Sequence, residues 1–304
     1  MKMQTVFCGL TLVAGAACMS TSASTSTAGE ASDISANRAA AIPSNFSSFA
    51  AKRQEAAQES AGSQDLAKKL SNPVADLISF PEQVNYDSNI GASDGVRRVV
   101  NVQPVAPFSL SENWNVISRT IIPLIDQDDV AGNSGHQTGV GDIVQSFFFS
   151  PKKPTASGLV WGVGPVLLLP TASDDLLGSD KWGAGPTAVL LKQAGPWTYG
   201  ALANHIWSFA GDDGRADINA TFLQPFASYS TPTAWTFSVN TESTYDWQAS
   251  EWSIPINGVV SKVTRFGTLP ISVFGGLRYW ADSPSSGPDG LGFRVGVTLL
   301  FPKG

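Results

Sequence analysis

The chain has 304 residues, of which 42% are hydrophobic and only 14% are charged. Soluble globular domains carry roughly 25% charged residues, so part of this surface is expected to contact something other than water. The formal net charge of -6 provides no basic face for a phosphate backbone, and this excludes nucleic acid as a partner.

The N-terminus has the pattern of an export signal. Lys2 precedes a mostly apolar run over residues 6–17, and small residues follow around Ala23 and Ala28. The apolar run is too short to cross a bilayer as a permanent helix. We therefore assign residues 1–23 to a cleavable signal peptide.

Both cysteines, Cys8 and Cys18, lie in this leader. Cleavage would leave a mature chain with no disulfide to form in an oxidising compartment. Attachment of lipid to Cys18 is the alternative form of processing, because residues 15–18 resemble a bacterial lipoprotein box.

Residues 24–72 form a polar segment that predicts a flexible linker. The first part is rich in Ser, Thr, Ala and Asn without periodicity, whereas residues 47–70 favour a helix that Gly62 interrupts. Two interpretations of this helix remain open: a partly ordered periplasmic tail or a helix that binds a partner.

Beyond residue 80 the chain is rich in β-branched and aromatic residues, which favour strands. Twelve strands are predicted, at 82–90, 97–108, 114–125, 139–149, 159–170, 183–192, 197–209, 218–229, 235–247, 252–263, 270–280 and 291–301.

The connections between these strands alternate in kind. Short turns such as 111–113 and 194–196 alternate with longer acidic loops such as 126–138 and 172–182. An even strand count with short turns at one rim and long loops at the other is typical of an outer-membrane barrel. The predicted fold is an all-β antiparallel transmembrane β-barrel of about 12 strands over residues 73–304.

Aromatic residues mark the ends of the predicted strands on their apolar faces. In strand 197–209, small residues separate the two aromatic ends, and at about 3.3 Å per residue with a tilt near 40° the strand rises roughly 30 Å. This is close to the height between the aromatic girdles of a membrane barrel, whereas a soluble sandwich would not require it. The expected girdle residues are Trp197, Tyr199, Trp207, Phe209, Trp235, Tyr245 and Trp247.

Prolines fall inside several predicted strands, where each removes a hydrogen bond of the ladder. We expect them to mark bulges or strand ends. They are Pro104, Pro123, Pro165, Pro186, Pro225 and Pro255.

From about Asn72 onward the chain resembles a family of Gram-negative outer-membrane barrels named for the meta-cleavage pathway of phenol degradation. Members are often labelled transporters or, by error, neuromedin U. The matching phrases, which cover about three-quarters of the chain, include "NPVADLISFPEQVNYD", "TGVGDIVQSFFFSPK" and "GPWTYGALANHIWSFAGD". The resemblance implies a barrel that moves small aromatic or hydrophobic compounds, and it supplies no catalytic residues. One departure is that Phe301 is not terminal, since residues 302–304 follow it.

A barrel of about twelve strands should enclose a narrow lumen that passes or holds one small molecule. Two interpretations of its charges are open: Arg119, Arg278 and Arg294 form a strip that attracts small anions opposite Glu242, or the charges pair across strands and plug the lumen. The residues expected to face the lumen are Asp87, Arg97, Arg119, Asn240, Glu242, Asp246, Arg278 and Arg294.

Catalytic, cofactor and metal sites are not predicted. His136 follows Ser134 in a glycine-rich segment expected to be an external loop, and His205 is expected at the membrane interface; neither has the spacing of a nucleophile with its base or of a zinc site. The aspartates of the long loops are expected to be solvated rather than to bind calcium.

The sequence therefore predicts an exported outer-membrane barrel that passes or binds small solutes. Its expected partners are outer-membrane lipid and lipopolysaccharide, the barrel-insertion machinery and a small solute of unknown identity. A structural or adhesive barrel with a closed lumen is the alternative, and a lipid-modifying enzyme is a more remote one.

Overall fold

The computed structural model describes residues 44–302, so the expected signal peptide, Cys18 and residues 24–43 of the expected linker lie outside the described residues. The described chain contains one α-helix, one short 3-10 helix and fifteen strand segments. They are α1 (Ser44–Leu70), β1 (Ile78–Ile90), η1 (Gly91–Ser93), β2 (Gly95–Val102), β3 (Val105–Ser109), β4 (Trp114–Asp128), β5 (His136–Val140), β6 (Ile143–Pro151), β7 (Leu159–Leu169), β8 (Lys181–Ala194), β9 (Trp197–Gly211), β10 (Asn219–Ser230), β11 (Trp235–Thr241), β12 (Ser243–Asp246), β13 (Glu251–Phe266), β14 (Leu269–Asp282) and β15 (Gly290–Phe301).

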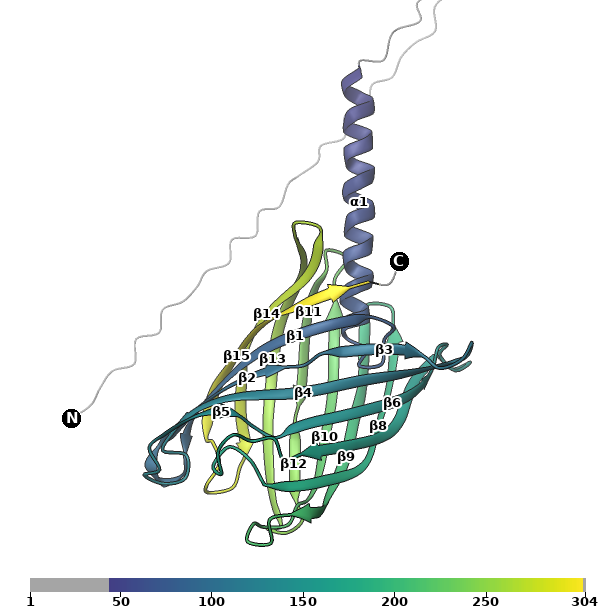
Figure 1. Ribbon diagram of the computed structural model, residues 1–304. Helices are drawn as coiled ribbons and strands as arrows, with labels where there is room; N and C mark the ends of the chain where they lie inside the picture. Colours follow the sequence, from purple (N-terminus) through teal and green to yellow (C-terminus); the bar gives the residue numbers. More distant parts are fainter. Residues whose placement is uncertain (1–43, 303–304) are drawn as a thin grey trace, which may run out of the picture. The chain divides into compact units, whose positions relative to one another are not determined.

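The strands form one closed antiparallel barrel (Figure 1). Each strand pairs with its neighbours in the chain, and β15 closes the barrel on β1 over a continuous register from Ile78 opposite Phe301 to Tyr86 opposite Phe293. Three strands are interrupted, so that β2 with β3, β5 with β6, and β11 with β12 each count once. The predicted barrel of 12 strands is confirmed.

The prolines do not all behave as expected. Pro104 lies at the break between β2 and β3, and Pro255 lies at a register shift in β13. The other four prolines lie within continuous strands, so the expectation of bulges or strand ends is wrong for them. Pro165 lies opposite Pro186, where neither residue has an N–H to leave unpaired. The Pro123 carbonyl still accepts a hydrogen bond from the Gly141 amide.

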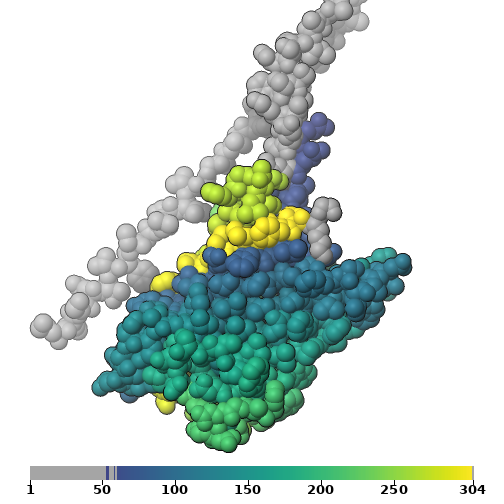
Figure 2. Space-filling model, in the orientation of Figure 1, coloured from purple at the N-terminus to yellow at the C-terminus, as the bar shows by residue number. Residues whose placement is uncertain are grey.

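Many large apolar side chains of the strands are exposed on the outer surface of the barrel. On the face shown in Figure 2, the atoms of the strands form a continuous surface. Phe209 is 67% exposed and Leu277 is 63% exposed, although a water-soluble barrel would bury residues of this kind. Alternate positions of the same strands face inward and carry polar or small residues, among them Asn85, Asn257 and Thr298. No helix in residues 44–302 has the length and apolar character needed to cross a membrane.

Aromatic pairs occur at both ends of the strands. At the end with the short turns, Trp197 packs edge-on against Tyr229 at 5.0 Å between ring centroids. At the end with the long loops, Tyr245 packs against Trp247 at 4.8 Å and His205 packs against Trp207 at 4.0 Å. Six of the seven expected girdle residues are at least 44% exposed, the exception being the partly buried Tyr245.

The chain before the first strand contributes to the core of the barrel. Helix α1 begins at Ser44, three residues before the predicted start, and β1 begins at Ile78 rather than at residue 82. Val74 packs with Ile117 and other inward residues of β6, β8 and β9, and Leu77 packs with residues of β13 and β15. Residues 71–77 are therefore part of the folded core, although the sequence predicts a flexible linker up to residue 72.

Gly185 of β8 makes a close backbone contact that no other residue can make. A Cβ atom there would lie 1.7 Å from the His205 carbonyl oxygen of β9. We expect Gly185→Ala to force the two strands apart, at a cost of about 1–3 kcal/mol, and to lower the temperature at which the folded protein loses its faster migration in a gel. Gly258→Ala is the matched control, since a Cβ atom at Gly258 meets nothing within 4 Å. Equal transition temperatures for the two variants would contradict this prediction.

Candidate functional site

The barrel interior contains two cavities of about 320 Å³ each. Residues 69–73 line the turn-side cavity together with Ala67, Ala75 and Leu77, and the loop-side cavity includes Ile206, Ile218 and Thr244. Four residues line both cavities: Gln83 of β1, Gln103 between β2 and β3, Arg119 of β4, and Gln224 of β10. These four residues, which we call the junction ring, mark where the two cavities meet.

Arg294 of β15 lies at the centre of a buried polar cluster. Its Nη1 and Nη2 atoms donate to the Oε1 and Oε2 atoms of Glu242 at 2.9 and 2.6 Å, and its Nε donates to Asn85 Oδ1 at 2.7 Å. The side chain of Arg294 is 3% exposed and that of Glu242 is 22% exposed. The two-pronged geometry and the burial make this the strongest ion pair of the lumen.

Arg278 of β14 lies beside this pair. Its Nε atom is 3.4 Å from Asp87 Oδ1 and its Nη1 atom is 3.8 Å from Glu242 Oε2, although Nε lacks hydrogen-bond geometry. The guanidinium lies over the ring of Trp280 at 4.5 Å, and Trp280 Nε1 donates to the same Asp87 oxygen at 2.8 Å. Arg278 thus contacts both carboxylates of the cluster, and it shares Glu242 with Arg294.

Arg97 and Arg119 have a different environment. The Nε atom of Arg97 donates to Gln127 Oε1 at 3.0 Å, and the Nη2 atom of Arg119 donates to Gln103 Oε1 at 2.8 Å. Among the described residues, no carboxylate lies within 4.0 Å of either guanidinium. The two open interpretations of the lumen charges therefore apply to different arginines: Arg278 and Arg294 form close ion pairs, whereas Asp87 and Glu242 attract Arg97 and Arg119 only from beyond 4.0 Å.

The remaining expected lumen residues lie at two levels. Asn240 of β11 accepts a hydrogen bond from Asn257 Nδ2 at 2.8 Å and lines the turn-side cavity. Asp246 lies at the exposed end of β12, where its carboxylate accepts the amides of Gln248 and Ala249.

Several inward amides were missed from the sequence, although strand alternation places them on the same face as the expected charges. Gln127 and Asn257 are almost fully buried, and Gln83 donates to Asn85 Oδ1 at 3.3 Å. An uncharged amide does not require an ionic partner inside a barrel, so the sequence gives a weaker signal for its position than it gives for a charged residue. They satisfy the polar atoms of the cluster and belong to the lumen lining.

The last turn of α1 and the segment that follows it lie at the turn-side end of the lumen. Ala67, Val74 and Leu77 are each at most 6% exposed, and Gln193 Nε2 donates to the Lys68 carbonyl at 2.9 Å. Residues 67–77, which we call the N-terminal plug, therefore occupy part of the cross-section of the barrel.

The loop between β7 and β8, residues 170–180, lies at the opposite end of the lumen. The Asp142 carboxylate accepts the amides of Ala172 and Ser179 and the Ser179 hydroxyl, the last two at 2.6 Å. The carbonyl of Leu176 accepts a hydrogen bond from the buried Gln127 side chain, and Leu177 is 6% exposed. This loop is fixed to the inner wall and is not a free surface loop.

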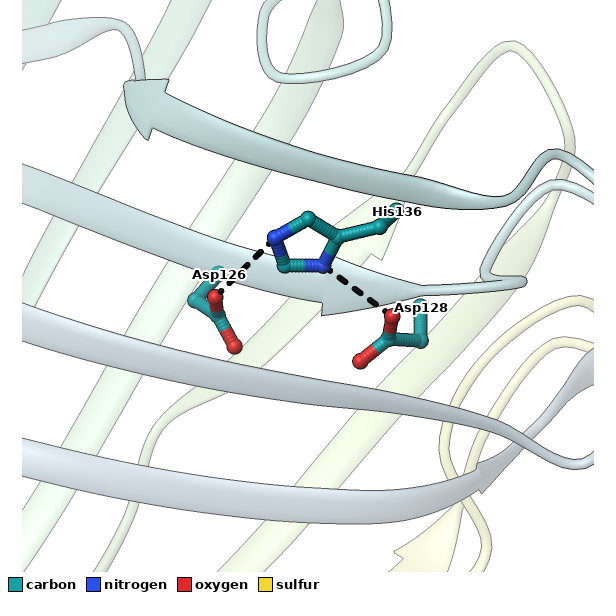
Figure 3. Close-up of side chains that lie close together, drawn as sticks. All are labelled: Asp126, Asp128 and His136. Atoms are coloured by element: carbon teal, nitrogen blue, oxygen red, sulfur yellow. Dashed lines mark hydrogen bonds and ion pairs between the residues drawn. The ribbon is translucent and has the colours of Figure 1, made fainter.

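His136 and two aspartates form a cluster on the outer face of β4 and β5 (Figure 3). The Nδ1 atom of His136 lies 3.0 Å from Asp128 Oδ1, and its Nε2 atom lies 3.5 Å from Asp126 Oδ2. The sequence placed these residues in an external loop, and this was wrong: β4 continues to Asp128 and β5 begins at His136, because the hairpin closes more tightly than predicted.

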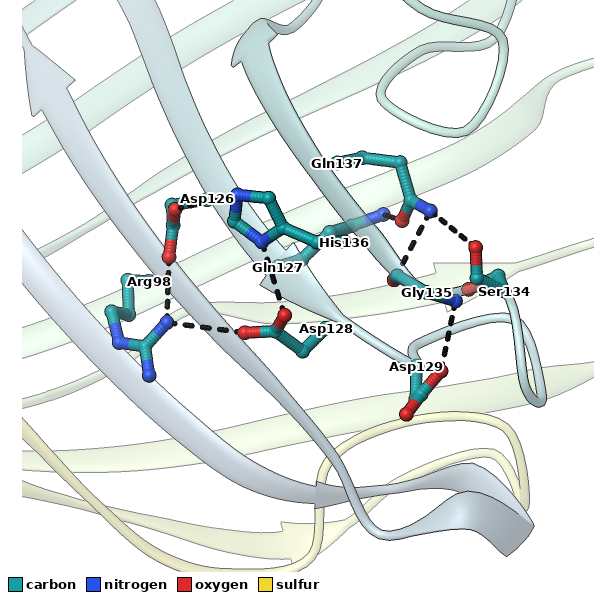
Figure 4. A network of polar contacts seen from close by, with 9 residues as sticks. All are labelled: Arg98, Asp126, Gln127, Asp128, Asp129, Ser134, Gly135, His136 and Gln137. Atoms are coloured by element: carbon teal, nitrogen blue, oxygen red, sulfur yellow. Dashed lines mark hydrogen bonds and ion pairs between the residues drawn. The ribbon is translucent and has the colours of Figure 1, made fainter.

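This cluster offers three ligand atoms within 4.8 Å of one another, as a metal ion would require. However, Arg98 Nη1 already lies 2.6 Å from Asp126 Oδ1 and 3.4 Å from Asp128 Oδ2 (Figure 4). A divalent cation would have to displace the Arg98 guanidinium.

The nucleophile and base needed by the enzyme alternative are not paired in this cluster. Both ring nitrogens of His136 face aspartates, and Ser134 Oγ accepts the Ala131 amide at 3.3 Å. The arrangement is that of a surface ion-pair network at the loop end of the barrel.

No family model and no curated protein matches this sequence. Among solved structures, the COG4313 outer membrane channel from Pseudomonas putida F1 is similar, with a TM-score of 0.60 and 13% identity over 74% of this chain and 95% of the other. A bacterial polysaccharide outer membrane secretin has a TM-score of 0.35 at 11% identity, over 75% of this chain and 99% of the other. A mutant of the Rh. blastica porin has a TM-score of 0.23 at 11% identity, over 74% of this chain and 99% of the other. Only the first bears on the fold, and it agrees with the barrel.

Removal of Arg294 tests the buried ion pair. Arg294→Ala leaves Glu242 without its two-pronged partner, and we expect the free energy of unfolding to fall by about 3–5 kcal/mol in a urea titration of the protein in lipid vesicles. Arg98→Ala is the matched control: the side chains of Arg98 and Asp126, which lie 2.6 Å apart, are 47% and 40% exposed, so the loss of this contact should change the free energy of unfolding little. Similar losses for the two variants would contradict the assignment of the lumen pair as the stronger one.

Asp217, which lies in the loop between β9 and β10, is expected to make the stability of the fold depend on pH. The hydrogen bond from Lys181 Nζ, at 3.0 Å, lowers the pKa of the Asp217 carboxyl below its usual value. A lowered pKa in the folded state stabilises the fold above the usual carboxyl pKa, and this contribution is lost as the pH falls through the lowered value.

We expect the melting temperature of the wild-type protein to fall as the pH is lowered from the usual carboxyl pKa through the lowered pKa of Asp217. The melting temperature of Asp217→Asn should fall less over the same pH range. At neutral pH, Asp217→Asn should melt lower than wild type because Lys181, with a side chain only 7% exposed, loses its carboxylate. Ser208→Ala, which removes only the 3.2 Å bond to Asp217, should retain most of the acid dependence. Identical acid profiles for wild type and Asp217→Asn would contradict the prediction.

Proposed function

We propose that this protein is an outer-membrane channel that passes or holds small aromatic or hydrophobic solutes. The observation that carries the proposal is a closed barrel with opposite surfaces inside and out. Outside, exposed apolar side chains lie between two bands of aromatic pairs. Inside, polar and apolar residues line two cavities large enough for a small molecule.

The proposed location is the bacterial outer membrane. A closed barrel leaves no backbone edge unpaired in lipid, and apolar residues such as Leu277 and Leu291 suit contact with acyl chains. We propose export through the leader at residues 1–23, assembly by the barrel-insertion machinery, and contact with lipopolysaccharide at the loop end. Kinship with the phenol-degradation barrels is part of the same proposal.

The solute class follows from the walls of the loop-side cavity. Ile121, Val144, Leu202 and Phe222 contribute apolar surface to this cavity, and polar residues such as Asn101 also line it. Pockets for small molecules are commonly apolar with a few placed polar groups. A compact solute with an aromatic or hydrocarbon body suits this space better than a sugar or a peptide.

A structural or adhesive barrel with a closed lumen is the second candidate. The N-terminal plug favours it, because Val74 is packed against inward residues of four strands at the turn-side end. Loop 170–180 also favours a closed lumen, because hydrogen bonds hold it against the inner wall at the loop-side end. The two candidates differ in whether a solute can pass the N-terminal plug. In a channel the plug leaves an opening or moves aside, and in a structural barrel it keeps the lumen closed.

Val74 provides the test of the channel. We expect wild-type protein in planar bilayers to conduct small ions weakly. Val74→Glu should conduct more, because a carboxylate buried among apolar residues is costly and will displace the plug from the core. Ser60→Ala is the control: it removes only the α1 hydroxyl bond to the Pro232 carbonyl and should conduct like wild type.

The outcomes separate the candidates. Conductance by wild type that increases in Val74→Glu supports the channel. Conductance by Val74→Glu alone would support the closed structural barrel. No conductance from either protein, in samples whose unboiled band migrates faster than the boiled one, would overturn the channel proposal, and turnover of phospholipid in detergent would revive the enzyme alternative.

A further inference from the structure

The polar cluster of the lumen has more positive than negative groups. Its arginines are Arg97, Arg119, Arg278 and Arg294, and its carboxylates are Asp87 and Glu242. Both carboxylates are engaged by Arg278 and Arg294. A buried or half-buried guanidinium is costly without an anion, so the two remaining arginines are positions where an anion from outside the protein would be stabilised.

Arg119 differs from Arg97 in its access to the cavities. Arg119 belongs to the junction ring and lines both cavities, whereas Arg97 lines neither. The other members of the ring, Gln83, Gln103 and Gln224, are uncharged. A solute that moves between the two cavities must therefore pass the one cation of the ring.

The apolar wall of the loop-side cavity starts next to this cation. Ile121 follows Arg119 on the same face of β4 and Val144 lies on the adjacent β6, while Leu202 and Phe222 of β9 and β10 add apolar surface to the same cavity. The lining of the loop-side cavity thus includes a guanidinium at its inner end, several hydrocarbon side chains, and the Glu242 carboxylate, which is paired with Arg294. A ligand that matches the guanidinium and the hydrocarbon side chains is an amphipathic anion.

We infer that Arg119 is the binding group for the carboxylate of a small amphipathic monocarboxylate, whose aromatic or hydrocarbon body lies against the apolar wall of the loop-side cavity. This inference rests on the proposed channel function and names its substrate class. The planar guanidinium matches a carboxylate through paired hydrogen bonds, and only its Nη2 atom is engaged, by Gln103. Neither neutral nor cationic analogues can neutralise the Arg119 charge.

The test measures binding of benzoate to the full-length protein in detergent by isothermal titration calorimetry at neutral pH, in parallel with bilayer conductance. Benzyl alcohol supplies the same ring without the charge, and acetate supplies the charge without the ring. We expect benzoate to bind more tightly than either. Arg119→Gln should weaken benzoate binding about tenfold or more, since charge-assisted hydrogen bonds are lost.

Arg97→Gln is the matched control, because it removes the same charge from the same cluster without altering either cavity. It should bind benzoate within about twofold of wild type, whereas Arg119→Lys, which keeps the charge but not the fork, should be intermediate. If Arg119→Gln does not fold, two other measurements provide the test. They are the affinity of the wild-type protein for benzoate relative to benzyl alcohol, and the affinity of Arg119→Lys for benzoate.

Three results would overturn the inference. The first is equal benzoate affinity for wild type and Arg119→Gln, and the second is an equal loss in Arg97→Gln and Arg119→Gln, which would indicate a diffuse field. The third is competition by chloride or acetate as strong as by benzoate, which would indicate a site for inorganic or simple anions. Conductance without Arg119-dependent binding would overturn the inference alone, and Arg119-dependent binding without conductance would overturn the channel alone.

Discussion

Backbone pairing between the first and last strands is the constraint on which the rest of this structure depends. Nine residues of β1, from Ile78 to Tyr86, pair in unbroken register with β15, and this closes the sheet. Within lipid, an open edge would leave N–H and C=O groups without partners. Closure also fixes the circumference, so that inward side chains from strands distant in sequence lie at the same level of the lumen. The bonds of Arg294 to Glu242 and Asn85 exist only because of that closure.

Both ends of this closed lumen are narrowed by the chain itself, and they are narrowed by different means. At the turn side, the N-terminal plug is held by apolar packing of Val74 and Leu77. At the loop side, loop 170–180 is held by hydrogen bonds to Asp142 and Gln127. Apolar packing is weakened by a single polar substitution, whereas a hydrogen-bonded loop depends on the carboxylate that anchors it. The two cavities lie between these closures and meet at Arg119.

The ionic groups of the lumen divide into those that stabilise the barrel and those that remain available to a ligand. Arg278 and Arg294 hold strands β14, β15, β1 and the β11–β12 break together through Asp87 and Glu242. Within residues 44–302, the side-chain hydrogen bonds of Arg97 and Arg119 go to glutamine side chains. Glutamine orients a guanidinium but does not neutralise it, and of these two arginines Arg119 alone lines the cavities. A stable pair and an available charge therefore coexist within one polar cluster.

The sequence by itself determined the features that repeat locally. Alternation with a period of two predicted the strands, their count and which residues face outward, and the spacing of turns and loops predicted the two rims. It placed Asp126 and His136 in a loop, outside the strands. The structure extends the strands to both residues, because the point where a hairpin ends is set by strand pairing rather than by composition. Only the tertiary structure decided which arginines are paired, that residues 71–77 enter the core, and that Gln83, Gln103, Arg119 and Gln224 meet at one level. These contacts join segments far apart in the chain, such as Glu242 and Arg294, 52 residues apart. They follow from register and closure around the whole barrel, and no local pattern encodes them.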